Sequence, residues 1–338
     1  MYVGTQLSGG MLEQLGDQYL RQLAQLGIVH VCIDPPGNPY SWNCDVLARH
    51  LDRIDAAGLI LDMVQLPLPS SGIDKPHGSP SIVLGLPGER DRELDGLCRL
   101  IEDLSAMGIG AAKYNFNLLG IPRTPSERGR GGAVLSTYRA EQATDSAVLT
   151  RAGEVDAEEM WERITYFLER VVPVAEANRL RLACHPHDPL TPPGYRGVQE
   201  RVLGSAEGLK RFVSICESPY HGLNFCQGTI AESLEHPREE IGEIIRWFGE
   251  RKKIFNVHFR NIKGGRFSFT EEFPDAGDMN MPAAFRLYRE VGVDCMIMPD
   301  HVPHIDGQAP FETAFAFAFG YIIALFQANG WDPYGARA

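Results

Sequence analysis

Short apolar runs alternate along the chain with longer segments whose apolar residues recur at helical spacing. Runs of four to seven apolar residues are typical of buried strands, whereas a period near 3.6 is typical of amphipathic helices. Strands are predicted at Tyr2–Leu7, Val29–Ile33, Ile60–Leu66, Gly110–Phe116, Arg181–His185, Leu223–Cys226, Ile254–Phe259 and Cys295–Met298. Helices are predicted at Met11–Leu26, Cys44–Ala57, Glu89–Met107, Ala157–Ala177, Ser205–Cys216, Arg238–Glu250, Pro282–Val291 and Phe311–Gln327.

The eightfold alternation of strand and helix determines the predicted fold class. Consecutive strands joined by helices are parallel, because the helix returns the chain to the starting end of the sheet. Eight such units suit an α/β fold closed as a (β/α)8 TIM barrel, and 338 residues fit a single domain over 1–338. The alternative is an open doubly wound sheet, which would carry a G-x-G-x-x-G turn that this sequence lacks.

Two of the predicted connections are too long for simple loops. Residues 67–88 follow the third strand and residues 117–156 follow the fourth. Long connections at this position often serve as lids or binding loops, so we expect an active-site insertion at about 117–156. It carries Arg123, Arg128 and Arg130 among glycines, and guanidinium groups bind carboxylates in bidentate fashion. Substrate binding by Arg128 and Arg130 is one interpretation, and a mobile solvated insertion is the other.

Composition narrows the range of partners. The 32 Lys and Arg residues against 44 Asp and Glu give a formal charge of −12, which argues against nucleic acid and against an anionic membrane surface. A small anionic substrate stays compatible, because local arginines can reverse the field in one cleft. Seven scattered cysteines and a start without a secretory signal favour a reducing, cytoplasmic location.

One apolar stretch, Ala314–Ala328, requires a separate interpretation. It is shorter than the roughly 20 residues that a membrane span needs, and Gln327 lies within it. We therefore expect no membrane span. The prediction is a helix buried on most sides and placed partly at a contact between subunits of a homo-oligomer.

The last four predicted strands each end in a side chain that can bind a metal. These residues are His185, Cys226, His258 and Asp300. Singly, each has an ordinary structural explanation: hydrogen-bonded histidines, a buried thiol or a helix cap. Because strand ends converge at one mouth of a TIM barrel, four in succession predict a metal site. Imidazole and carboxylate suit Mn²⁺ or Fe²⁺, while the thiolate also tolerates Zn²⁺ and argues against Mg²⁺ or Ca²⁺.

The motifs around these strand ends resemble those of a known enzyme family. The segments KYNF, CHPHDP, SPYHGLNFCQGT, VHFRNI, EEFPDAGDMNM and PDH follow in order from the fourth strand to the eighth. Together they resemble the mannonate dehydratases of hexuronate catabolism. The resemblance implies a xylose-isomerase-like TIM barrel that converts D-mannonate to 2-keto-3-deoxy-D-gluconate with manganese or ferrous iron. It also implies that the four strand-end residues bind the metal and that His301 is a catalytic acid or base.

The sequence departs from the family pattern around the last strand. Met298 and Val302 occupy positions where the family has arginine and glycine, and Phe315 lies near the place of a family tyrosine. Tyr321 is out of register with that place, and His187 replaces an acidic residue. The metal site is therefore expected to carry over better than the proton-transfer groups, and a related aldonic acid could replace D-mannonate.

Dehydration of a sugar acid requires removal of the C2 proton and protonation of the leaving 3-hydroxyl. His301 can serve in either role, or can instead orient Asp300. Arg260 follows the ligand His258 closely and is the second predicted catalytic residue, with a plain ion pair as its alternative. Further predicted substrate-binding residues are Tyr114, Asn115, Asn261, Asp275 and Asp278. For these the alternatives are barrel packing and loop stabilisation.

Two other functions stay open on sequence alone. A metal-dependent sugar isomerase or epimerase would need the same barrel and a similar carbohydrate site. A non-catalytic sugar-acid binder could use the same scaffold without turnover. The mass of the product would distinguish them, because only the dehydratase loses water.

Overall fold

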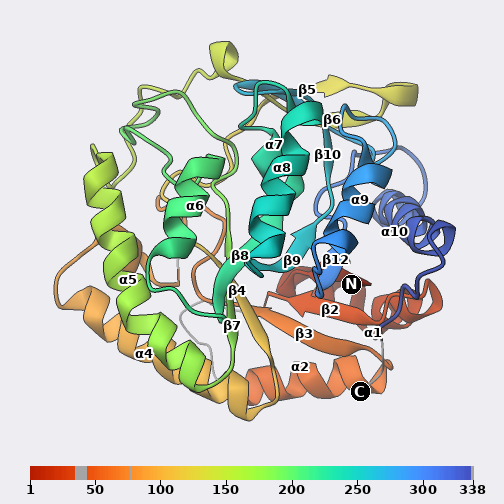
Figure 1. The fold of residues 1–338 in the computed structure, drawn as a ribbon, viewed down its shortest axis with the longest axis horizontal. Coiled ribbons are helices and arrows are strands. Elements are labelled where there is room, and N and C mark those ends of the chain that lie inside the picture. Colours follow the sequence, from red (N-terminus) through yellow and green to blue (C-terminus); the bar gives the residue numbers. More distant parts are fainter. Residues whose placement is uncertain (35–43, 77, 336–338) are drawn as a thin grey trace.

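The computed structural model describes residues 1–338 except 35–43, 77 and 336–338, and its centre is a closed barrel of parallel strands (Figure 1). The strands are β1 (Tyr2–Leu7), β2 (His30–Ile33), β3 (Ile60–Gln65), β4 (Ala111–Asn115), β7 (Arg181–His185), β8 (His221–Cys226), β9 (Ile254–His258) and β12 (Met296–Met298). They pair in chain order, and β12 pairs with β1 to close the ring. The predicted TIM barrel is confirmed, with every strand starting within two residues of its predicted start.

Alternation along each strand decides which side chains enter the barrel. A small interior cluster is formed by Cys32, Met63, Ala111, Ala183, Phe255, Met296 and Met298. Residues two positions further along the same strands also point inward, because side chains alternate between the two faces of a strand. His185, two residues after Ala183, and Asp300, two residues after Met298, therefore reach the carboxyl-terminal mouth of the barrel.

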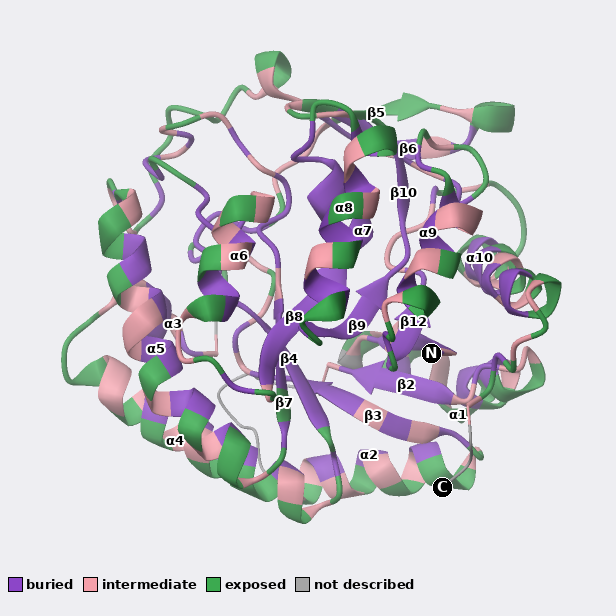
Figure 2. Cartoon of the chain, in the orientation of Figure 1, coloured by how far each residue is buried: buried purple, intermediate pink, exposed green. Residues whose placement is uncertain are grey.

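The predicted helices surround the barrel and bury one face each (Figure 2). They are α1 (Gly9–Gln25), α2 (Cys44–Ala56), α4 (Glu89–Ala106), α5 (Ala157–Ala177), α6 (Ala206–Ser214), α8 (Pro237–Glu250), α9 (Met281–Glu290) and α10 (Pro310–Ala328). Two short helices that the pattern did not predict, α3 (Pro80–Leu84) and α7 (Gln227–Ala231), lie in connections. Within α1 the helical backbone is interrupted at Gly16, whose φ is 62°.

Helix α10 differs from its prediction. Only 39% of its most apolar stretch is buried, so the helix packs through one face instead of most sides. Phe311 and Phe317 are 38% and 44% exposed. By length and composition α10 is the one helix in the described part of the chain that could cross a membrane, a weak signal that core helices of soluble proteins also give.

A second, four-stranded sheet lies at the carboxyl-terminal end of the barrel and was not predicted. It consists of β5 (Thr124–Arg128), β6 (Val134–Arg139), β10 (Asn261–Gly265) and β11 (Ser268–Glu272). Its order is β10-β11-β6-β5, and all pairs are antiparallel. The insertion at 117–156 is thus an ordered hairpin paired with the segment that follows β9. Val134 also pairs with His304 beyond β12.

Candidate active site

Four side chains from neighbouring strands converge at the barrel mouth. One ligand atom from each of His185, Cys226, His258 and Asp300 lies within 4.8 Å of the others. The Asp300 carboxylate is central, with its Oδ1 3.1 Å from His258 Nδ1 and its Oδ2 3.5 Å from Cys226 Sγ. The side chains predicted to bind a metal are therefore brought together.

The imidazole of His185 is oriented by its own turn. Its Nδ1 lies 2.7 Å from the Pro186 carbonyl oxygen and donates to it, which leaves the Nε2 lone pair for the site. Burial lowers the pKa of His185 below its usual range and outweighs the opposing effect of Asp300. The ring is consequently neutral, as a metal ligand must be.

The other histidine of the site is held from the barrel interior. Asn224 contacts His258 Nε2 through its side-chain amide at 3.1 Å, and Asn256 contacts Asn224 at 2.6 Å. His258 Nδ1 is buried and lies 3.1 Å from Asp300 Oδ1. If the Asn224 and Asn256 amides are both turned by 180°, Asn224 accepts a hydrogen bond from Nε2, Asn256 accepts one from Asn224, and Nδ1 keeps its lone pair. A nitrogen that faces another of the four converging side chains in this way fits a metal ligand.

Hydrogen-bond donors surround the sulfur of Cys226. The Thr229 hydroxyl and backbone N–H lie 3.1 and 3.4 Å from Sγ, and an Arg260 Nη lies at 3.6 Å. The thiolate is the form of cysteine that binds a metal. Two imidazoles, a thiolate and a carboxylate thus fit a first-row divalent metal at this position.

Arg260 is buried beneath the four ligands and does not reach the cavity. Its guanidinium contacts four carboxylates: Glu232 at 2.6 Å, Glu271 at 2.9 Å, Asp188 at 3.1 Å and Asp300 at 3.2 Å. No edge of the planar group is left for a substrate. The prediction that Arg260 is catalytic is therefore corrected: it positions Asp300 and Cys226 and balances buried negative charge.

A second arginine, Arg123, enters the same buried network from the insertion. It lies 2.7 Å from Asp188 and 2.5 Å from Glu271. Arg123 and Arg260 hold the pKa of Glu271 at about 2 together with His301, against the effect of burial. Burial raises the pKa of Glu232 well above its usual range, although Arg260 and Arg123 oppose this shift.

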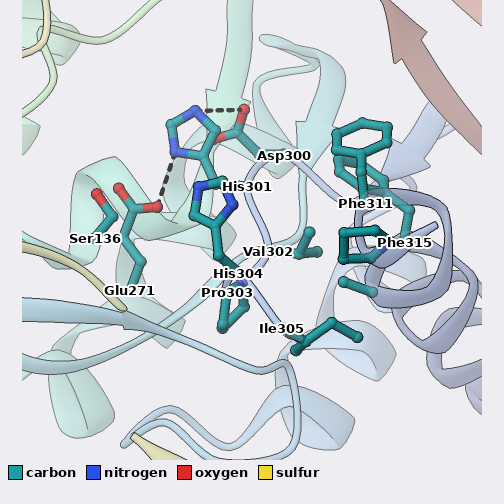
Figure 3. Close-up of a pocket in the computed structure, with 12 residues that line it drawn as sticks. Ser136, Glu271, Asp300, His301, Val302, Pro303, His304, Ile305, Phe311 and Phe315 are labelled. Carbon is teal, nitrogen blue, oxygen red and sulfur yellow. Dashed lines mark hydrogen bonds and ion pairs between the residues drawn. The ribbon is translucent and has the colours of Figure 1, made fainter. Parts of the chain in front are cut away.

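His301 lies beside the metal ligands and faces a cavity. Its Nδ1 contacts Glu271 Oε2 at 2.9 Å and its Nε2 is 3.7 Å from Asp300 Oδ1 (Figure 3). Burial lowers the pKa of His301, but Asp300 and Glu271 outweigh it and raise the pKa to about 10. The ring therefore carries a proton on both nitrogens near neutral pH, and the contact with Glu271 fixes its orientation.

The cavity beside His301 has a volume of about 380 Å³. Its polar lining residues are Ser136, Glu271, Asp300, His301 and His304. Its apolar lining residues are Val302, Pro303, Ile305, Pro310, Phe311, Ala314 and Phe315. The cavity is large enough for a six-carbon acid and joins directly to Asp300 and His301 (Figure 3).

Tyr114 and Asn115, the two predicted site residues on β4, point to opposite faces of the strand. Tyr114 is fully buried and points outward, with its ring 5.2 Å from that of Phe167 on α5. Asn115 points inward beside His185, to which it is paired across β4 and β7. The prediction that Tyr114 faces the mouth is therefore wrong, since it alternates with Asn115. Asn115 stays a candidate.

Asn261 and Asp278 hold the loop that follows β9. Both ends of the Asn261 amide bond backbone groups of Ile262, Pro274 and Met279, and Asp278 accepts from the Gly264 N–H at 2.8 Å. All polar atoms of Asn261 are used in these bonds. Its predicted substrate role is corrected to loop stabilisation, and Asp278 acts similarly.

The arginines predicted to bind substrate lie outside the cavity. Arg130 pairs with Asp275 at 2.6 Å and covers the rings of Phe273 and Phe317. Arg128 is exposed and donates to the Gly132 carbonyl at 2.8 Å. None of Arg128, Arg130 and Asp275 lines the cavity, so these predictions are corrected: the pair joins the hairpin to the loop before α9.

Some residues near the site were missed by sequence reasoning. Glu271 was overlooked although it is the first residue of the EEFPDAGDMNM motif, which was the available signal. Lys113 lies inside the barrel, 3.6 Å from Asp34, and could have been found because it has the inward parity of Asn115. His304 lines the cavity three residues beyond His301, and its proximity in sequence was the available signal.

Comparison with known proteins places the chain in a family. Residues 133–330 match the family model described as D-mannonate dehydratase (UxuA). The chain belongs to the D-mannonate dehydratase family. It is therefore a carbon–oxygen lyase that dehydrates a sugar acid, and the matched region contains all four converging ligands.

The chain is also similar to individual mannonate dehydratases in sequence and in structure. The mannonate dehydratase of Thermotoga maritima is 28% identical, over 91% of this chain and 93% of that protein. That of Streptococcus agalactiae is 28% identical, over 89% and 91%. The crystal structure of mannonate dehydratase from Streptococcus suis superposes with a TM-score of 0.82 at 21% identity, covering 100% of this chain and 97% of that one. The D-psicose 3-epimerase of Clostridium cellulolyticum shares the barrel, with a TM-score of 0.58 at 13% identity over 98% of each chain.

Proposed function

We propose that the protein dehydrates D-mannonate, or a closely related aldonic acid, to the 2-keto-3-deoxy acid, with Mn²⁺ or Fe²⁺ held by His185, Cys226, His258 and Asp300. The observation that carries the proposal is the convergence of these four ligand atoms beside the His301–Glu271 pair and an open cavity. Family membership supports the reaction class. Seven cysteines, all free in the structure, support a cytoplasmic location.

Each residue at the site has a distinct role in the proposed dehydration. A bound divalent metal would supply Lewis-acid stabilisation of the charge that develops on the substrate carboxylate. His301 reaches the cavity from beside the four converging side chains, and its protonated ring can donate a proton to the leaving 3-hydroxyl, while Glu271 fixes the orientation of the ring. Arg260 and Arg123 keep Glu271 and Asp300 ionised by compensating their charge in the buried layer below.

The test measures metal and product in parallel. Protein purified without chelator should contain manganese or iron, and a His258→Ala variant should lose it. Given D-mannonate and related aldonic acids, the protein should release an α-keto acid lighter by one water. His301→Asn should abolish turnover and keep the metal content, because its ring is not among the ligands.

Three results would contradict parts of the proposal. A product isomeric with a free sugar substrate would establish a sugar isomerase instead of a dehydratase. Metal content unchanged by His258→Ala would refute the ligand set. Full turnover by the His301→Asn variant would refute the role given to His301.

A further inference from the structure

The cavity beside His301 is polar at one end only. Asp300, His301 and Glu271 lie together at one end, and Val302, Ile305, Phe311 and Phe315 form the opposite wall (Figure 3). A substrate that places its reacting carbons at Asp300 and His301 therefore directs the rest of its chain along an apolar surface.

A hexonate brings three more hydroxyl groups, on C4, C5 and C6, into this space. The polar lining groups other than the reacting end are Ser136 and His304. Ser136 Oγ accepts a hydrogen bond from Arg123 Nε at 3.0 Å, so its O–H is free to donate, and Ser136 and His304 together face three hydroxyl groups. The cavity thus offers fewer hydrogen-bond partners than the tail has hydroxyl groups, and a buried hydroxyl without a partner weakens binding.

The distal wall is made by helix α10 together with the segment after β12. Phe311 and Phe315 are one helical turn apart, with ring centroids separated by 4.5 Å, so they present one continuous aromatic surface. Val302 and Ile305 continue this surface toward His301. Contact with a methyl group buries apolar surface and therefore favours binding, whereas contact with a hydroxyl group at this surface does not.

We propose that the preferred substrate is an aldonic acid with an apolar terminal carbon, a 6-deoxyhexonate in place of a hexonate. The proposal rests on the dehydratase function proposed above and specifies the substrate class of the same cavity. The chemistry at C2 and C3 is unchanged: the C2–H and C3–O bonds break, water leaves, and the enol product becomes the 2-keto-3-deoxy acid.

The decisive comparison uses two acids that differ by a single oxygen atom. D-mannonate and 6-deoxy-D-mannonate are supplied separately to the protein loaded with Mn²⁺, and kcat/KM is measured for each. We expect the deoxy acid to be favoured by about 10- to 100-fold, the range that an apolar pocket achieves against an added hydroxyl. Equal values, or a preference for D-mannonate, would overturn the proposal.

A binding measurement separates failure of this inference from failure of the proposed function. Titration calorimetry of each acid into the same protein measures its binding affinity, which depends on contact with the apolar wall and does not require turnover. If neither acid is dehydrated, the proposed function fails. The wall is then still supported by tighter binding of the deoxy acid, or refuted by equal binding.

A single substitution tests the wall itself. Val302→Thr keeps the side-chain shape and adds one hydroxyl in the cavity, so the preference for the deoxy acid should shrink by several-fold. Val148→Thr makes the same chemical change at a position that is 58% exposed, away from the cavity lining, and should leave the preference unchanged. Equal effects of the two variants would refute the assignment of the wall.

Discussion

Replacement of Arg260 tests the buried charge network under the metal ligands. The guanidinium is fully buried and contacts Glu232, Glu271, Asp188 and Asp300 within 3.2 Å. Arg260→Met keeps much of the side-chain volume and removes the charge, leaving these carboxylates with Arg123 as the arginine of the network. Loss of one partner of a buried ion pair typically costs about 3–5 kcal/mol, and we expect a loss of that size in the free energy of unfolding.

Glu232→Gln provides the contrast within the same network. Burial raises the pKa of Glu232 well above its usual range, so the charged form of this carboxyl is disfavoured, and an amide has nearly the same shape. We expect this substitution to cost less than about 1 kcal/mol. Arg266→Met is the matched surface control: its partner is Glu235, both side chains are largely exposed, and such pairs contribute about 0–1 kcal/mol.

The assay is urea unfolding followed by circular dichroism at pH 7, on metal-free protein so that metal binding does not contribute to stability. If Arg260→Met does not fold, Arg260→Lys retains the charge and should fall between that variant and the wild type. A cost for Arg260→Met no larger than that of Arg266→Met would refute the reasoning. So would a Glu232→Gln cost as large as that of Arg260→Met.

Other predictions follow from side chains around the site. Asn224→Ala should weaken metal binding about 10- to 100-fold in competition with a chelator, because it removes the group that orients His258; unchanged affinity would exclude that role. Burial lowers the pKa of His187 to about 3 from 6.5, so the folded ring stays neutral while the unfolded chain takes up a proton. Its contribution to stability is therefore present above pH 6.5 and lost as the pH falls toward 3, and His187→Asn should flatten the pH dependence of unfolding there. Tyr114→Phe should leave KM unchanged, since the ring faces α5; a large rise in KM would place Tyr114 at the mouth after all.

The barrel could be predicted from sequence because its signal is local. Each strand is a run of apolar residues bounded by a helical pattern, and Arg181–His185 was predicted to the residue. The second sheet gave no such signal, because β5 reads Thr-Pro-Ser-Glu-Arg and is mostly exposed. An exposed strand that pairs through its backbone needs no apolar alternation, and β6, which buries Leu135, Thr137 and Tyr138, lies inside the long connection, so both were expected to be loop.

The convergence of His185, Cys226, His258 and Asp300 could be predicted, and the surroundings of their neighbours could not. The four residues lie at strand ends, and strand ends converge in every closed barrel of this kind. Arg260 is only two residues from His258, yet its side chain turns into the buried layer, where it contacts Glu232 and Asp188. Closeness in sequence to His258 shows that Arg260 lies near the site. It does not show whether the side chain faces the cavity or the buried layer, because that depends on Glu232 and Asp188, which are 28 and 72 residues away.

The anchoring of Arg123 has a consequence for how such barrels can change over evolutionary time. Surface insertions are usually gained and lost freely, because few buried groups depend on them. Here a shortened chain without residues 117–156 would lose a cation that contacts Asp188 and Glu271. A descendant that loses the hairpin must therefore also replace Asp188 or Glu271. We expect the hairpin and that carboxylate to be kept or lost together.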